Sequence, residues 1–121
     1  MRQQLDTTYL LTEWGIWQRS GQGIPRYLSP ALAVIVQNVQ QNGPLLCSIS
    51  EEMAMTVDGV VARLMKRDRE AGDAVFGYYV LGVSYAALGK IMGIPKTRAE
   101  MLHKSGVAWV DGALDRMQVA A

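Results

Sequence analysis

Hydrophobic residues recur every three or four positions along most of this chain, which is the spacing of one face of an α-helix. The clearest stripe lies between positions 53 and 65 and consists of Met53, Val57, Val60, Val61, Leu64 and Met65. Weaker stripes predict further helices over 3–19, 31–41 and 70–81. Glycine and proline interrupt the pattern at 20–25 and 42–49, where we expect loops. The pattern therefore predicts an all-α fold.

Two of these helices have identifiable starting signals. Ser29 followed by Pro30 is a good helix opening, because serine caps the first turn and proline is tolerated there. Ser48 and Ser50 both offer caps to the next helix, and Glu51, three residues after Ser48, matches a capping box. The run 34–36 (Val-Ile-Val) has strand character, which competes with the helix expected there.

The amino-terminal helix carries a pair of tryptophans. Leu10, Trp14 and Trp17 share one helical face, and Gly15 between the tryptophans is small enough to let another element pack closely. We interpret both tryptophans as core residues, since aromatic stripes usually mark a buried face. The alternative is an exposed pair that docks a partner.

Residues 82–104 have the pattern of a helix-turn-helix. Ser84 can cap a short first helix, whose inner face would carry Leu88 and Met92. Gly93 stands where that helix must stop and the chain must turn, a position suited to positive φ. Pro95 is well placed at the start of the second helix, where its missing N–H does no harm.

The second helix of this pair would bury Ala99 and Leu102 and turn a polar face outward. We expect the outward residues to be Lys96, Thr97, Arg98, Glu100, Met101, His103 and Lys104. A short helix, a glycine turn and a basic second helix form the arrangement that places a recognition helix in the DNA major groove. The alternative is an ordinary helical hairpin whose charges are only solvated.

The helices on either side have their own expected inner faces. In 70–81 we expect Val75, Tyr78, Tyr79 and Phe76 to point inward. The last helix continues the recognition helix with Leu102, Gly106, Trp109, Ala113 and Met117 at intervals of three and four, and Trp109 is its expected anchor. Basic residues end the 48–69 segment: Arg63, Lys66, Arg67 and Arg69. We interpret them as partners of the helix dipole, with phosphate contact as the alternative.

Composition limits the possible functions. The chain has 121 residues, half of them hydrophobic, so we expect one helical domain over 1–121, with an amino-terminal part at 1–43 and a helix-turn-helix part at 48–118. Twelve Lys and Arg against 11 Asp and Glu give a net charge of +1, which argues against a general nucleic-acid coat. Any DNA binding should therefore be local.

We expect no metal, no cofactor and no catalytic activity. One cysteine and one histidine are too few for a zinc site, and no phosphate loop or catalytic triad can be placed. Asp111 and Asp115 are an isolated acidic pair. No apolar run reaches the ~20 residues that span a bilayer, and 2–6 is too polar to begin a signal peptide, so we expect a cytoplasmic protein without membrane contact.

Three segments near the carboxyl end resemble a known family. They are 78–84 (Tyr-Tyr-Val-Leu-Gly-Val-Ser), 93–97 (Gly-Ile-Pro-Lys-Thr) and 108–114 (Ala-Trp-Val-Asp-Gly-Ala-Leu). This region is similar to the carboxy-terminal part of lambdoid phage antitermination protein Q and to the promoter-reading domain of bacterial σ factors. The segment 14–17 (Trp-Gly-Ile-Trp) resembles the paired-tryptophan segment of the same Q family. Together the matches cover most of the chain in the right order.

The chain departs from the commoner pattern at four positions, Ala87, Gly89, Pro95 and Ala99, which bears on the strength of DNA contact. One branch of Q proteins carries a zinc finger, and the ligand count here places the chain in the zinc-free branch. The resemblance implies a late-gene antitermination factor. Such a factor binds a double-stranded DNA element at the late promoter and loads onto paused RNA polymerase with its σ factor, in the host cytoplasm. It then suppresses pausing and termination, with nascent RNA as a further possible contact.

In this sequence we expect base-edge contacts from Lys96, Thr97, Arg98 and Met101, since arginine paired with guanine is the commonest specific contact. Phosphate contacts are expected from Ser84, Lys90 and Lys104. The polymerase-contacting surface is expected in the amino-terminal third. Two alternatives stay open: a plain helix-turn-helix repressor or activator, and a helical protein–protein adaptor.

Overall fold

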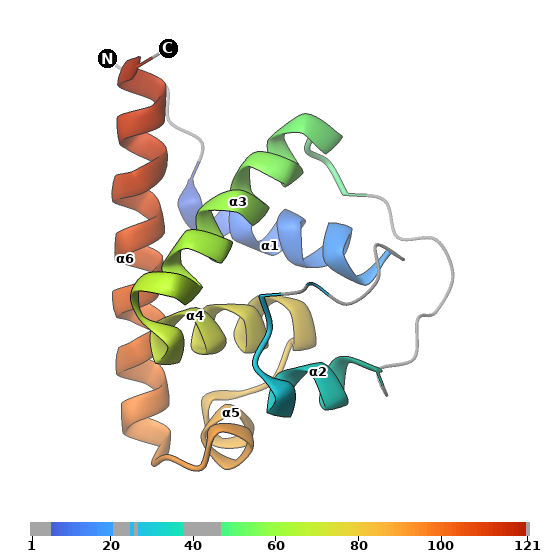
Figure 1. The fold of residues 1–121 in the computed structure, drawn as a ribbon, viewed down its shortest axis with the longest axis vertical. Helices are drawn as coiled ribbons and strands as arrows, with labels where there is room; N and C mark the ends of the chain where they lie inside the picture. The colour runs from blue at the N-terminus through green and yellow to red at the C-terminus, as the bar shows by residue number, and fades with distance from the viewer. Residues whose placement is uncertain (1–5, 21–24, 26, 38–46, 121) are drawn as a thin grey trace.

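A computed structural model describes residues 6–20, 25, 27–37 and 47–120. Its helices are α1 (Thr7–Arg19), α2 (Pro30–Gln37), α3 (Glu51–Arg67), α4 (Arg69–Phe76), a π-helix η1 (Gly77–Leu81), α5 (Tyr85–Met92) and α6 (Lys96–Ala120). The described residues contain no strand, so the all-α prediction is confirmed. The long α6 forms one side of the molecule, with α1, α3 and α4 packed beside it and α5 next to its amino-terminal end (Figure 1).

The core joins the amino-terminal helix to the helices that follow. Trp14 is fully buried and meets Phe76 of α4 edge to face, with ring centroids 5.6 Å apart. Leu10 and Leu11 of α1 belong to the same cluster. The interpretation of Trp14 as a core residue is thus confirmed, while Trp17 is half-buried and packs against the same core.

The strongest stripe in the sequence also lies where it was expected. Val57, Val60, Val61, Leu64 and Met65 of α3 are all buried. The capping box at Ser48 is wrong, because the cap is Ser50, whose side chain accepts a hydrogen bond from the amide of Met53 at 3.0 Å. Ser48 instead ties the start of α3 to α1, since its amide donates to Glu13 Oε1 at 2.7 Å.

The first residues of α1 and α2 differ slightly from the helix starts that the sequence predicted. α1 begins at Thr7 behind the cap Asp6, and positions 3–5 of the expected helix lie outside the described residues. α2 begins at Pro30, as the Ser29-Pro30 signal indicated, and runs as a helix through the strand-like 34–36. Positions 38–41 lie outside the described residues.

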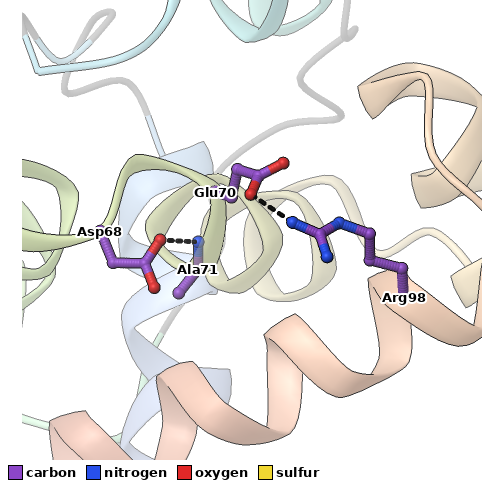
Figure 2. A network of polar contacts seen from close by, with 4 residues as sticks. All are labelled: Asp68, Glu70, Ala71 and Arg98. Carbon is purple, nitrogen blue, oxygen red and sulfur yellow. Dashed lines mark hydrogen bonds and ion pairs between the residues drawn. The ribbon is translucent and has the colours of Figure 1, made fainter.

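The expected single helix over 70–81 is two elements. Asp68 ends α3 and also caps α4, because its carboxylate accepts a hydrogen bond from the Ala71 amide at 3.2 Å (Figure 2). After Phe76 the backbone widens into the π-helix η1 and stops at Gly82, whose φ of +68° is left-handed. Val75, Phe76 and Tyr79 are buried as expected, while Tyr78 is half-buried.

The inner face of α6 is rotated relative to the prediction. The buried residues are Ala99, His103, Gly106, Val110, Ala113 and Leu114. Val110 is the fully buried anchor, whereas Trp109 is only half-buried and Met117 is 40% exposed. The small residues decide this orientation: a Cβ added at Gly106 would lie 2.5 Å from Val75 Cγ2 and 3.1 Å from the Ala71 carbonyl oxygen. α4 therefore lies too close to α6 for a tryptophan between them.

Candidate functional site

The segment from Ser84 to Lys104 folds as two helices joined by a tight turn. Ser84 caps α5, with its Oγ accepting from the Ala87 amide at 3.2 Å. α5 ends at Gly93, which has a φ of +72°, and the Ile94 amide donates to the Gly89 carbonyl at 2.9 Å. The carbonyl of Pro95 then accepts from the Ala99 amide at 3.0 Å, which opens α6. The expected glycine turn between two helices is present.

A small separate core holds these two helices together. Leu88, Ala99 and Ala74 of α4 are completely buried in it. A Cβ added at Gly89 would lie 2.6 Å from the Ile94 carbonyl oxygen, so α5 approaches the turn as closely as backbone allows. These contacts fix the direction in which α6 leaves the turn.

All seven residues predicted to contact DNA are exposed. Five of them lie on the first three turns of α6: Lys96, Thr97, Arg98, Met101 and Lys104. Met101 is 62% exposed, so its apolar side chain is accessible on the same face as these polar residues. Ser84 and Lys90 lie at the two ends of α5, and the Ser84 hydroxyl is already engaged as the helix cap.

Two of the expected cations already have carboxylate partners. Arg98 Nη2 lies 2.6 Å from Glu70 Oε1 at the start of α4, as Figure 2 shows. Both side chains are about half exposed, at 47% and 49%, so this ion pair contributes little to stability. Lys104 Nζ lies 2.8 Å from Glu100 Oε2, one turn before it on α6. Lys90 and Lys96 form no ion pair within the described part of the chain.

The hydrogen bond and charge of Lys104 lower the pKa of the Glu100 carboxyl, and Glu100 in turn raises the pKa of Lys104. The Lys104 side chain is 68% exposed and that of Glu100 is 38% exposed, so water screens this pair. A DNA phosphate would have to compete with the partly exposed Glu100 carboxylate for Lys104. Because water screens the pair, this competition would weaken phosphate binding only modestly.

The prediction that His103 faces outward is wrong. Its side chain is 7% exposed and lies between two phenols, with Nε2 3.1 Å from Tyr79 Oη and Nδ1 3.0 Å from Tyr85 Oη. The imidazole also packs on Tyr78, with ring centroids 4.1 Å apart. The position is four residues after the buried Ala99, on the same face of α6, which explains the burial.

The histidine and three tyrosines form a cluster that sequence analysis missed. Burial, and to a smaller extent the adjacent Lys104, lowers the pKa of His103. Burial also raises the pKa of Tyr79 to about 12. The cluster joins η1, α5 and α6, and three tyrosines within eight residues were the only local signal for it.

A second polar cluster joins α1 to α3. Trp14 Nε1 and Gln18 Nε2 donate to the same oxygen of Asp58, at 3.2 Å and 2.5 Å, and the Tyr27 hydroxyl donates to it as well. Burial, followed by the hydrogen bond to Asp58 and its charge, raises the pKa of the Tyr27 phenol. This cluster is structural, because its polar atoms satisfy one another.

The described residues contain neither a metal-ligand cluster nor a membrane-spanning helix. They contain no group of three or more His, Cys, Asp and Glu side chains arranged for a metal ion. Asp111 is engaged by the hydroxyl of Thr7. In the same residues no helix is both long enough and apolar enough to cross a bilayer.

Comparison with known proteins gives one consistent family. The model of the phage antitermination protein Q family matches residues 4–121. Antitermination protein Q of Escherichia phage 933W is 26% identical over 103 residues, which cover 83% of this chain and 69% of the relative. The protein of the same name from Enterobacteria phage VT2-Sa gives the same values. No solved structure matches. The chain therefore belongs to the phage antitermination protein Q family, non-enzymatic transcription factors that act on RNA polymerase.

Proposed function

We propose that this chain binds a short DNA element at the phage late promoter through α5 and α6, and that α6 is its recognition helix. It then loads onto RNA polymerase paused just downstream, with σ still present, and suppresses pausing and termination. The observation that supports the DNA step most directly is the exposed group at the start of α6: Lys96, Thr97, Arg98 and Met101, projecting from a helix whose opposite face is fixed by Ala99 and His103. A rigid helix with exposed side chains in its first turns is what major-groove reading requires.

The proposed roles follow from position. Arg98 reads a base, and an arginine that engages the O6 and N7 of guanine adds ~1–3 kcal/mol of discrimination. Lys96, Thr97 and Met101 flank it. Lys90 and Lys104 contact phosphates on either side, together with the amino-terminal end of α5 at Ser84, and so fix the register.

Arg98 must leave its ion pair with Glu70 in order to contact a base. In the free protein its guanidinium is paired with Glu70, and the half-exposed pair can open at small cost. Glu70 then becomes an acceptor beside the DNA, where it repels phosphate and disfavours non-specific binding. Loss of the Arg98 charge should therefore weaken DNA binding, and loss of the Glu70 charge should not.

The experiment is single-round transcription across a strong terminator, from a template with the cognate late promoter. It compares the wild type with Arg98→Ala and Glu70→Gln, and the same proteins are titrated with promoter DNA. We expect wild-type read-through, about tenfold weaker promoter binding and no read-through for Arg98→Ala, and equal or tighter binding for Glu70→Gln.

Glu70→Gln is the matched control because both changes remove the same ion pair. If both variants lose activity equally, the pair acts structurally and Arg98 does not read DNA. DNA binding without read-through would leave an ordinary repressor or activator. Full activity of a Lys96→Ala, Arg98→Ala double variant would leave a protein–protein adaptor.

We place the polymerase-binding surface in the amino-terminal third. With one cysteine and one histidine, we assign the chain to the zinc-free branch of the family. Nascent RNA is a further contact that this location would allow.

A further inference from the structure

A second basic site lies on α6, away from its first turns. A pocket of 470 Å³ opens where the carboxy-terminal half of α3 passes α6, two helices that Figure 1 shows side by side. Six residues line it: Arg63 and Arg67 from α3, and Trp109, Ala113, Arg116 and Met117 from α6. None of them has a part in the proposed promoter contact.

The three arginines of this pocket are exposed cations. Among the residues that the structure describes, none of the three forms an ion pair. Arg63 Nη2 lies 3.6 Å from Met117 Sδ, which holds its guanidinium at the rim of the pocket. Arg69 is different, since its Nη1 donates to the Tyr27 carbonyl at 2.6 Å and so has a structural role.

The dipole of α3 accounts for the position of only some of these arginines. Arg67 lies in the last turn of α3, where a cation is favourable. Arg116 comes from another helix and gains nothing from the end of α3. Three like charges around one hollow repel one another, so an anion bound among them would be stabilised.

Trp109 and Met117 give the lining of the pocket an aromatic and apolar part. Trp109 is only half-buried, because Val110 is the residue that anchors this part of α6 in the core. Met117 beside it is 40% exposed. An indole and a thioether flanked by guanidinium groups can hold a flat ring by stacking.

We propose that this pocket binds a single-stranded nucleic acid, with one base on Trp109 and Met117 and the flanking phosphates on Arg63, Arg67 and Arg116. Each nucleotide of a single strand carries both a negative charge and a flat ring. The arginines of the pocket complement the charge, and Trp109 and Met117 complement the ring. A duplex keeps its bases stacked inside and cannot place one against a recessed indole. An acidic peptide could pair with the arginines, but its acidic residues carry no ring that could stack on Trp109.

The pocket is separate from the proposed promoter contact. Arg98 and Arg116 are 18 positions apart on one helix (116 − 98), which is roughly 27 Å along the axis. The two sites can therefore be disabled independently. The proposal does not rest on promoter binding by α5 and α6.

The test is a titration of the full chain into fluorescein-labelled ten-nucleotide oligomers, one of uridine RNA and one of thymidine DNA, followed by anisotropy at several salt concentrations. We compare the wild type with an Arg67→Gln, Arg116→Gln double variant and with Lys66→Gln. Lys66 is an exposed cation next to Arg67 that does not line the pocket, so Lys66→Gln is the control, and the single variant Arg67→Gln is included because it removes the same amount of charge.

We expect the double arginine variant to bind roughly tenfold or more weakly, and the steepness of its salt dependence to fall by about 0.7 for each phosphate that the variant no longer neutralises. The lysine variant should stay within about twofold of the wild type. Trp109→Leu should weaken binding by a similar factor, and Trp109→Phe should restore most of it, because a phenyl ring still stacks. Tighter binding of RNA or of DNA identifies the source of the strand, and either preference supports the site.

Three outcomes would overturn the proposal. The first is equal weakening by Arg67→Gln and Lys66→Gln, which would mean that only the general field of the protein attracts the strand. The second is unchanged binding by both Trp109 variants when the arginine variant binds weakly. The third is displacement of the oligomers by an acidic peptide at lower concentration than by unlabelled RNA or DNA, which would assign the pocket to a protein partner.

Discussion

Gly15 of α1 lies directly against the backbone of Tyr79 in η1: a Cβ at position 15 would lie 2.1 Å from the Tyr79 carbonyl oxygen and 2.8 Å from its carbonyl carbon. The obstacle is main chain, which cannot rotate away as the end of a side chain can. The contact joins the tryptophan-bearing helix to the element that leads into α5. The amino-terminal helix thus packs closely against the element that leads to the candidate DNA interface, and Arg19 Nη1 also donates to the Val80 carbonyl there, at 3.0 Å.

Replacing Gly15 by alanine should therefore destabilise the protein. We expect a loss of about 2–3 kcal/mol in the free energy of unfolding, even though alanine is the better helix former, because α1 must move away from η1. Urea unfolding followed by circular dichroism measures it. Gly59→Ala is the control, since position 59 in α3 has nothing within 4 Å of an added Cβ, and it should stabilise by ~0.5–1 kcal/mol.

Gly93 tests the turn between α5 and α6 in a different way. An added Cβ there would touch nothing within 4 Å, but φ is +72°, so the cost of Gly93→Ala is purely conformational. We expect a loss of about 1–2 kcal/mol in stability, and a smaller loss for Gly93→Asn, because asparagine tolerates left-handed backbone. Equal effects of the two substitutions in thermal unfolding would contradict this explanation.

The sequence predicted the features that depend on neighbours a few positions away. The stripe in α3, the cap at Ser84 and the glycine turn at Gly93 are local, and the structure has each of them where it was expected. The Ser48 cap failed because two serines competed for one helix start, and Ser50 stands directly before the first turn. Periodicity places a helix more reliably than it places its first residue.

The features that sequence analysis missed depend on distant neighbours. On α6 the spacing that predicted Trp109 as the anchor fits Val110 equally well, and only the close approach of α4 at Gly106 decides between them. His103 is buried by tyrosines 18 and 24 positions away. The same holds for the pocket, because Arg116 is distant in sequence from Arg63 and Arg67. For the seven candidate DNA contacts, the structure establishes exposure, and their roles stay predictions.

Asp58 should be the most sensitive polar position in the amino-terminal half. One of its oxygens accepts hydrogen bonds from Trp14, Gln18 and Tyr27. Asp58→Ala leaves the Trp14 and Tyr27 donors without this acceptor, while Gln18 Nε2 keeps only its longer contact to Tyr27 Oη at 3.3 Å, and we expect a loss of about 3 kcal/mol in the free energy of unfolding. Asp58→Asn keeps one acceptor oxygen and should cost clearly less. Equal stability of Asp58→Ala and the wild type in urea would show that water replaces the carboxylate.

His103 should make stability depend on pH in a defined window. Burial lowers its pKa in the folded state, so below the ordinary histidine pKa of 6.5 the unfolded chain binds a proton that the folded chain binds only at lower pH. Its contribution is complete above about pH 6.5 and is lost as the pH falls from there through the lowered folded pKa. The neighbouring Lys104 adds to this lowering, while Glu100 opposes it.

The measurement is the difference in the free energy of unfolding between wild type and His103→Gln, followed from pH 8 to pH 5. Because His103 is the only histidine, other groups that titrate in this range largely cancel in that difference. We expect the wild type to lose its advantage over His103→Gln as the pH falls below about 6.5. A difference that is constant with pH would mean that the imidazole titrates alike in the folded and unfolded states, and that the tyrosines around it do not keep it neutral.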